Sequence, residues 1–266
     1  MNLGGRRWGG ADVPLLRVDR LTVRFGGVTA LDEVSFAVEP GQVCGLIGPN
    51  GAGKTTLFDC VSRLTRPRAG RIEFDGRDLL ALPAHRVAAL GIARTFQHLG
   101  LVGSLTVREN VMLGGQQASR TGFGAAALRL PVVGREERAV RRRADELLDR
   151  VGLAHLAARP AAGLPYGTLK RIELARALGA APRLLLLDEP ASGLSHGEVD
   201  ELAGVVAGLR DDGELTVLLV EHHMGLVMRM SDKVVVLDFG RKIAEGAPSA
   251  VREDPVVVRA YLGVPA

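Results

Sequence analysis

A single stretch, residues 44–56, limits what this chain can fold into more than any other. Gly48 is followed by four residues and then by Gly-Lys-Thr, which is the spacing of a phosphate-binding P-loop. The apolar run Val43–Ile47 before it predicts a buried strand, and apolar residues at i, i+3, i+4 and i+7 from Leu57 predict an amphipathic helix after it. The loop is therefore expected at a helix N-terminus, where backbone N–H groups favour an anion.

The residue types in this loop predict a nucleoside triphosphate site. Its glycines allow a tight turn that brings backbone N–H groups close to phosphate oxygens. Lys54 can reach the β- and γ-phosphates, and the Thr55 hydroxyl can ligate Mg²⁺. The expected nucleotide-binding residues of the loop are Gly48, Pro49, Asn50, Gly51, Ala52, Gly53, Lys54, Thr55 and Thr56.

The remaining patterns predict an α/β protein with two kinds of sheet. Residues 15–38 alternate apolar and polar, which indicates antiparallel strands joined by a Gly26-Gly27 turn. Residues 79–90 have a helical pattern. Buried aliphatic strands separated by helices return at 184–187, 215–220 and 234–237, which indicates a mainly parallel sheet covered on both faces.

Strand signals are missing between about residues 97 and 169, where helical patterns surround a Gly- and Ala-rich loop at 114–134. This predicts an inserted α-helical subdomain. The expected organisation is a flexible tail at 1–12, a P-loop NTPase core with an N-terminal antiparallel β subdomain at 13–97 and 171–266, and the α-helical subdomain at 98–170.

Composition excludes several other classes. No apolar run approaches the roughly 18 to 20 residues that cross a bilayer, and the N-terminus lacks the apolar core of a secretory signal. Two cysteines, Cys44 and Cys60, cannot make a disulfide framework and are expected to be buried, which fits a reduced cytoplasmic compartment. The basic cluster at 135–143 is expected to be the solvated face of a helix, with contact to lipid headgroups or a partner as the alternative.

Acidic and imidazole side chains follow two of the predicted strands. Asp188 and Glu189 end the run of four leucines, where an unpaired buried charge would be costly. With a P-loop upstream, Asp188 is the expected Mg²⁺ ligand and Glu189 the group that polarises the attacking water. His222 ends the next strand, so its imidazole is expected at the same edge of the sheet, within reach of a γ-phosphate.

Two further features are ambiguous from the residues alone. Phe25, about twenty residues before the P-loop, could stack on an adenine or could be an ordinary core aromatic. Gly167 precedes a predicted helix and could form a second anion site at that N-terminus.

The order of these motifs resembles the nucleotide-binding subunits of ABC transporters. The resemblance rests on the P-loop, Gln97, the 164–170 segment, Asp188-Glu189, residues 191–194 and His222. More narrowly, the chain is similar to the ATPase subunit of branched-chain amino acid importers, through residues 91–97, 114–134, 220–222 and 258–263.

The resemblance implies roles that spacing alone does not give. It implies a head-to-tail dimer with a second ABC ATPase subunit, identical or different, in which Tyr166, Gly167 and Thr168 contact the γ-phosphate held by the partner's P-loop. Phe25 then stacks on the adenine, and Gln97 serves the Mg²⁺ and the lytic water. Pro165 stands where the superfamily usually has serine, so a hydroxyl and a backbone N–H are missing there.

The resemblance also implies partners and a location. The α-helical subdomain would receive a coupling helix from transmembrane permease subunits, a solute-binding protein would act indirectly, and no nucleic acid is expected. The chain would then work in the cytoplasm, bound peripherally at the inner face of the cell membrane.

Three alternatives compete with amino acid import. A urea, amide or lipopolysaccharide transporter ATPase would share the same core. A soluble ABC ATPase of DNA repair or translation would carry long coiled coils or two fused ATPase domains, and neither heptads nor an internal repeat is present. A P-loop GTPase would carry Asn-Lys-x-Asp, which is absent, and a P-loop kinase would need an acceptor pocket and lid.

Overall fold

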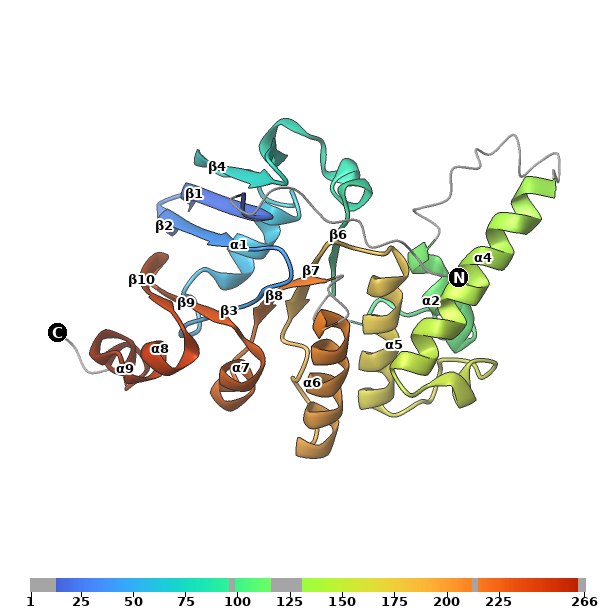
Figure 1. The fold of residues 1–266 in the computed structure, drawn as a ribbon. Coiled ribbons are helices and arrows are strands. Elements are labelled where there is room, and N and C mark those ends of the chain that lie inside the picture. The colour runs from blue at the N-terminus through green and yellow to red at the C-terminus, as the bar shows by residue number, and fades with distance from the viewer. Residues whose placement is uncertain (1–12, 96–98, 116–130, 212–214, 263–266) are drawn as a thin grey trace.

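The structure, a computed structural model, describes residues 13–95, 99–115, 131–211 and 215–262 (Figure 1). The expected tail at 1–12, Gln97, and most of the Gly- and Ala-rich loop lie outside the described residues.

The strands belong to two sheets. In chain order they are β1 (Leu16–Phe25), β2 (Val28–Val38), β3 (Val43–Ile47), β4 (Ala69–Phe74), β5 (Arg77–Asp78), β6 (Ile92–Arg94), β7 (Leu184–Asp188), β8 (Thr216–Val220), β9 (Lys233–Asp238) and β10 (Arg241–Gly246). The helices are α1 (Lys54–Val61), α2 (Val107–Gly115), α4 (Pro131–Arg150), α5 (Tyr166–Gly179), α6 (His196–Asp211), α7 (Met224–Met230), α8 (Pro248–Glu253) and α9 (Pro255–Leu262).

The first sheet is antiparallel, with strand order β2-β1-β4-β5. Leu16 pairs with Val38 and Phe25 with Val28, so the β1–β2 hairpin turns at Gly26-Gly27 as expected. Along β1 the aliphatic residues Leu16, Val18, Leu21 and Val23 are buried and most of the polar ones are exposed, which is why alternation predicted these strands.

The second sheet is mainly parallel, with strand order β10-β9-β3-β8-β7-β6. Strands β9, β3, β8, β7 and β6 are parallel neighbours, and β10 is an antiparallel edge. All five residues of β7 are buried: Leu184 and Leu186 pack toward α1 and the first sheet, whereas Leu185 and Leu187 pack toward α5 and α6. The expected α/β fold, with a parallel sheet covered on both faces, is confirmed.

Helix α1 lies between the two sheets, where Leu57, Phe58, Cys60 and Val61 are buried. This placement joins the antiparallel sheet to the parallel one through a single core, and it fixes the helix that follows the P-loop.

The two cysteines give a first testable prediction. Cys44 and Cys60 are buried free thiols, and burial raises the pKa of each to about 12. Because the thiolate is the reactive form, we expect the folded chain to resist a maleimide reagent at pH 7.5 and to react at both cysteines once denatured. Rapid labelling of the folded chain, followed by mass spectrometry, would contradict this packing.

The helices α2, α4 and α5 pack together beyond the β6 edge of the parallel sheet (Figure 1). Their shared core contains Val111, Leu147, Leu148 and Ile172. Helix α5 continues across residues 170 and 171, so the expected subdomain boundary there falls within a helix; the division into subdomains stays a prediction.

Two local patterns differ from the sequence expectations. Residues 79–90 form three separate 3₁₀ turns, η1 (Leu79–Ala81), η2 (Ala84–Arg86) and η3 (Ala88–Leu90). Pro83 separates the first two because it cannot donate a helical hydrogen bond. The expected loop at 114–134 is shorter at its ends, since α2 runs to Gly115 and α4 begins at Pro131.

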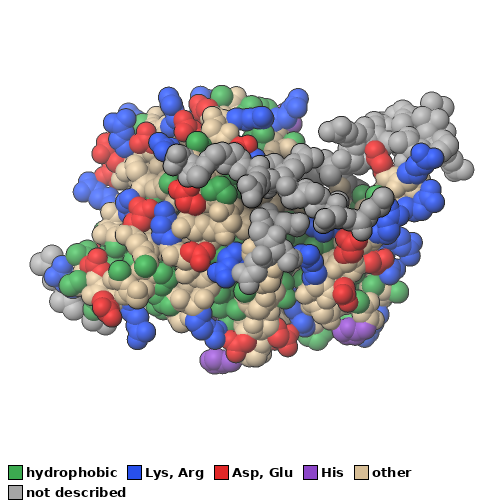
Figure 2. All heavy atoms as spheres, viewed as in Figure 1, with side chains coloured by type: hydrophobic (Ala, Val, Ile, Leu, Met, Phe, Trp, Pro, Cys, Tyr) green, Lys and Arg blue, Asp and Glu red, His purple; other side chains and the backbone are tan. Residues whose placement is uncertain are grey.

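The basic cluster lies on α4. Arg135, Arg138, Arg141 and Arg142 are exposed, while the apolar stripe of the same helix is buried. Figure 2 shows Lys and Arg side chains gathered over this helix at the right of the view. The expectation of a solvated helical face agrees with this exposure. Within the described residues, no helix is both long and apolar enough to cross a membrane.

Candidate functional site

The P-loop connects β3 to α1 and lies against neighbouring backbone. A Cβ added at Gly48 would lie 2.1 Å from the Leu237 carbonyl oxygen, and one at Gly53 would lie 2.5 Å from the Ala30 carbonyl oxygen. Both glycines also have positive φ, 151° and 100°. Glycine is therefore required at both positions by space as well as by backbone conformation.

Lys54 points back into this loop. Its Nζ donates hydrogen bonds to the carbonyl oxygens of Gly48 (2.6 Å) and Pro49 (2.8 Å), and the side chain is buried. Burial lowers the pKa of Lys54, and the nearby Glu189 carboxylate opposes that shift. A buried ammonium surrounded by loop backbone is a preformed counter-charge for a phosphate. Thr55 is exposed in the first turn of α1.

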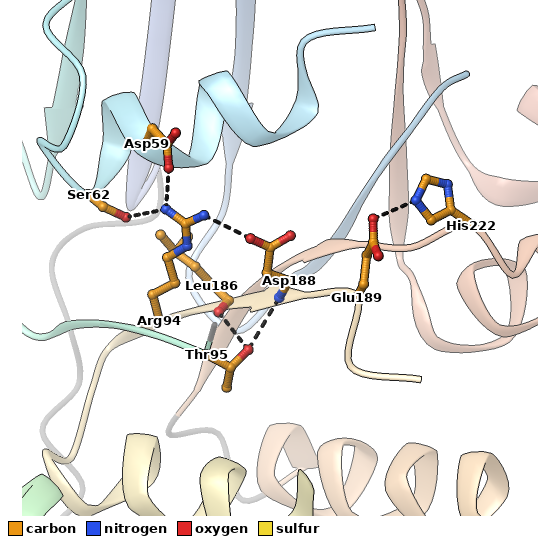
Figure 3. A network of polar contacts seen from close by, with 8 residues as sticks. All are labelled: Asp59, Ser62, Arg94, Thr95, Leu186, Asp188, Glu189 and His222. Atoms are coloured by element: carbon orange, nitrogen blue, oxygen red, sulfur yellow. Dashed lines mark hydrogen bonds and ion pairs between the residues drawn. The ribbon is translucent and has the colours of Figure 1, made fainter. Parts of the chain in front are cut away.

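Asp188 is the buried last residue of β7 and forms an ion pair that the sequence did not predict. Its Oδ2 accepts from Arg94 Nη2 at 2.8 Å, while Arg94 Nη1 donates to Asp59 Oδ1 at 2.7 Å (Figure 3). Arg94 ends β6, which pairs in parallel with β7, so its guanidinium joins α1 to the end of β7. The only sign of this pair in the sequence was that Arg94, a charged residue, lies within the predicted strand at 91–97.

The other oxygen of Asp188 bears on the expected metal. Among the described residues, the buried Oδ1 finds no hydrogen-bond partner. Magnesium in such sites uses one or two carboxylates together with a hydroxyl and substrate phosphates. An unsatisfied carboxylate oxygen at the sheet edge fits a Mg²⁺ ligand, with the Thr55 hydroxyl as the second protein group.

Glu189 and His222 meet although they follow different strands. His222 Nε2 lies 2.5 Å from Glu189 Oε1 (Figure 3). The two turns are adjacent because β7 and β8 are parallel neighbours in which Asp188 pairs with Val220. Glu189 has a positive φ of 47°, an unusual conformation for a residue with a side chain. The structure therefore brings together the two side chains that the sequence placed at one edge of the sheet.

Glu221 is a second residue that the sequence analysis left without a role. It is 2% exposed and follows β8 directly. Its Oε1 accepts from the Ala191 N–H (2.7 Å), and its Oε2 accepts from the N–H groups of His222 (3.0 Å) and His223 (3.4 Å). The sequence feature that could have indicated a role is that Glu221, a charged residue, stands between an aliphatic strand and a histidine.

The 164–168 segment starts α5. Pro165 is its N-cap, and Tyr166 is 43% exposed, with its ring near Gly193 and Lys170. A Cβ added at Gly167 would lie 1.9 Å from Glu198 Oε1, so a larger residue there would have to displace the Glu198 side chain of α6. Thr168 is buried. The segment's contacts here are with its own chain.

Phe25 and Gln97 have different outcomes. Phe25 is 53% exposed at the end of β1, so it is not a core aromatic, and its ring is accessible to a stacking partner. Gln97 lies outside the described residues, but Arg94 and Thr95 before it adjoin β7.

Comparison with known proteins identifies the family. A family model described as ABC transporter matches residues 31–192, which is more than half of the chain. The chain belongs to the ABC transporter family. This ABC ATPase also matches, over residues 241–266, a model described as branched-chain amino acid ATP-binding cassette transporter.

Relatives and solved structures agree with this family. The high-affinity branched-chain amino acid transport ATP-binding protein BraF of Pseudomonas aeruginosa is 43% identical over 250 residues, covering 94% of this chain and 98% of BraF. LivG of Escherichia coli strain K12, which carries the same description, is 42% identical with the same coverage. The structure of an ATP-binding cassette of an ABC transporter in its ADP conformation superposes with a TM-score of 0.82 at 31% identity, over 95% of this chain and all of that one.

The resemblance drawn from the motifs is confirmed by these matches. The chain is an ATP-binding, ATP-hydrolysing subunit of a transporter, and its nucleotide-binding fold is that of the cassette structures.

Proposed function

We propose that this ABC ATPase powers the import of branched-chain amino acids. The observation that carries the proposal is that the match along the whole chain and the match of its last residues point to the same branch. The identity to BraF and LivG extends over 98% of each relative, and residues 241–266, outside the general ATPase match, fit the branched-chain amino acid model. A urea, amide or lipopolysaccharide transporter is the competing substrate class.

In the proposed chemistry, the P-loop and Lys54 bind the triphosphate of ATP. Lys54 supplies positive charge at the β- and γ-phosphates, and Phe25 offers an exposed ring to the adenine. Thr55 and Oδ1 of Asp188 would hold Mg²⁺, which neutralises phosphate charge when bound. Gln97 would serve the metal and the attacking water.

Glu189 is proposed as the general base. Its carboxylate is partly exposed at the strand end and lies 2.5 Å from the His222 ring, which holds it in one orientation. Polarising a water requires such an oriented acceptor. The His222 imidazole can rotate so that one of its ring nitrogens hydrogen-bonds a γ-phosphate oxygen. Arg94 balances the charge of Asp188 through a 2.8 Å ion pair.

The dimer is proposed to place the start of α5 against a second subunit's nucleotide. Tyr166 is exposed at the first turn, where the N–H groups of a helix attract phosphate. Tyr166, Gly167 and Thr168 would then contact the γ-phosphate bound by another ABC ATPase subunit, either a copy of this chain or a different one.

The permease is proposed to dock at a cavity of about 410 Å³ between the parallel sheet and the helices. Its lining combines apolar side chains with an acid and two arginines, as a helix of mixed polarity would need. These lining residues include Val87, Ala88, Arg94, Leu113, Glu173, Arg176 and Ala177. Because Arg94 lines this cavity and also pairs with Asp188, docking and the nucleotide site share a residue. The chain would thus work at the inner face of the cell membrane, with a solute-binding protein acting indirectly.

Uptake by cells tests the proposed substrate. Deleting the gene for this chain should abolish high-affinity uptake of radiolabelled leucine and leave urea uptake unchanged. Wild-type protein supplied from a plasmid should restore leucine uptake, whereas the Glu189→Gln variant should not. Normal leucine uptake in the deletion strain together with loss of urea uptake would move the chain to the competing class.

A further inference from the structure

Glu221 connects the two turns that carry the proposed catalytic side chains. Its carboxylate accepts from Ala191 on one oxygen and from His222 and His223 on the other. Ala191 lies two residues after Glu189. A single buried side chain therefore makes hydrogen bonds to the backbone after β7 and to the backbone after β8.

The turn after β7 depends on such anchoring. Glu189 donates its own N–H to the Val220 carbonyl oxygen at 2.9 Å, and the Ala191 N–H is the next contact of that turn with the end of β8. Glu189, the first residue of this turn, has a positive φ of 47°. A non-glycine residue persists in this conformation only where its surroundings determine it.

The side chains that meet above these turns are Glu189 and His222, whose atoms are 2.5 Å apart. Since the two residues are on different turns, this distance depends on how the turns sit relative to each other. We propose that Glu221 is a positioning residue that holds Glu189 and His222 in register for ATP hydrolysis. The inference rests on the proposed roles of those two residues.

A carboxylate is suited to this task because both of its oxygens are acceptors. The amide of a glutamine has the same shape but one acceptor, and its NH₂ group cannot accept from a backbone N–H. The Glu221→Gln variant therefore removes at least one side of the bridge while conserving volume. Buried N–H groups left without a partner are unfavourable, so the affected turn is expected to shift.

The test is steady-state ATP hydrolysis by the full-length Glu221→Gln variant. If the isolated chain hydrolyses ATP too slowly to measure, the assembled transporter is used. We expect kcat to fall ten- to a hundredfold, as a displacement of about 1 Å at a reacting group can cause. KM for ATP is expected to stay within about twofold, because Glu221 contacts neither the P-loop nor Lys54 in the hydrogen bonds it makes here.

A matched control is Glu109→Gln. Glu109 also accepts a backbone N–H, that of Thr106 at 2.8 Å, together with the Thr106 hydroxyl at the start of α2. It makes the same carboxylate-to-amide change away from the site. We expect its kcat to remain within about twofold of wild type.

A double substitution separates positioning from a general structural role. The single-turnover rate of ATP hydrolysis is followed with γ-labelled ATP. In the His222→Ala background, Glu221→Gln should lower this rate by less than about twofold, because the contact between Glu189 and His222 that Glu221 positions is already lost. The same ten- to hundredfold loss in both backgrounds would overturn the inference, as would an unchanged kcat in Glu221→Gln alone. Neither result touches the proposed function, which fails only if Glu189→Gln retains turnover or the uptake test fails.

Discussion

Replacing Glu189 by glutamine is expected to lower kcat for ATP by about 10² to 10⁴, the usual contribution of a positioned general base. The variant should still bind ATP with an affinity within about twofold of wild type. The physical reason is that Gln conserves the shape and the acceptor oxygen near His222 Nε2, but its amide cannot take a proton from water.

The measurement compares steady-state hydrolysis with equilibrium binding of a fluorescent ATP analogue. The matched control is Glu245→Gln on β10, whose carboxylate pairs with Lys233 and Lys242 away from the nucleotide site. That control should hydrolyse ATP within about twofold of wild type. Wild-type turnover in Glu189→Gln would refute the assignment of the base.

Replacing Lys54 by alanine is expected to weaken ATP binding by about 10- to 150-fold, which is what the loss of a charged hydrogen bond worth about 1.5 to 3 kcal/mol produces. Lys54 lies buried inside the P-loop, so in the proposed complex its charge would act on the phosphates with little screening by bulk water. The change also removes the hydrogen bonds that Lys54 Nζ donates to the carbonyl oxygens of Gly48 and Pro49, although the Pro49 oxygen keeps the one from the Ala52 N–H.

Isothermal titration with ATP and Mg²⁺ measures this loss. Lys242→Ala serves as the control, because Lys242 carries the same charge but pairs with Glu245 on the β10 edge. Its ATP affinity should match wild type. Equal affinities for Lys54→Ala and wild type would remove the P-loop lysine from the account.

Strand ends were the most predictable part of this molecule. Four consecutive leucines before Asp188 are typical of a strand buried on both faces, and parallel neighbours bring their carboxyl ends to one edge. That reasoning placed Glu189 and His222 together before any coordinates. The glycine spacing likewise predicted the P-loop. The structure agrees, because a Cβ at Gly48 or Gly53 would collide with neighbouring backbone.

Contacts between distant segments were not predictable in the same way. The Arg94–Asp188 pair and the Glu221 bridge depend on which strands are neighbours and on side-chain direction, and local patterns carry neither. Strand β10 was not predicted because the charged residues Arg241, Lys242 and Glu245 break the apolar pattern that indicates a strand, as is common at the edge of a sheet.

In the proposed mechanism the P-loop, the end of β7 and the end of β8 act on one triphosphate. The most direct measurement is a crystal structure of the Glu189→Gln variant grown with ATP and Mg²⁺. The account predicts Lys54 Nζ within hydrogen-bond distance of the β- or γ-phosphate, Mg²⁺ about 2.1 Å from a Thr55 or Asp188 oxygen or from a water that Asp188 holds, and His222 facing the γ-phosphate. A nucleotide bound elsewhere, with Lys54 still turned onto Gly48 and Pro49 and no metal near Asp188, would contradict it.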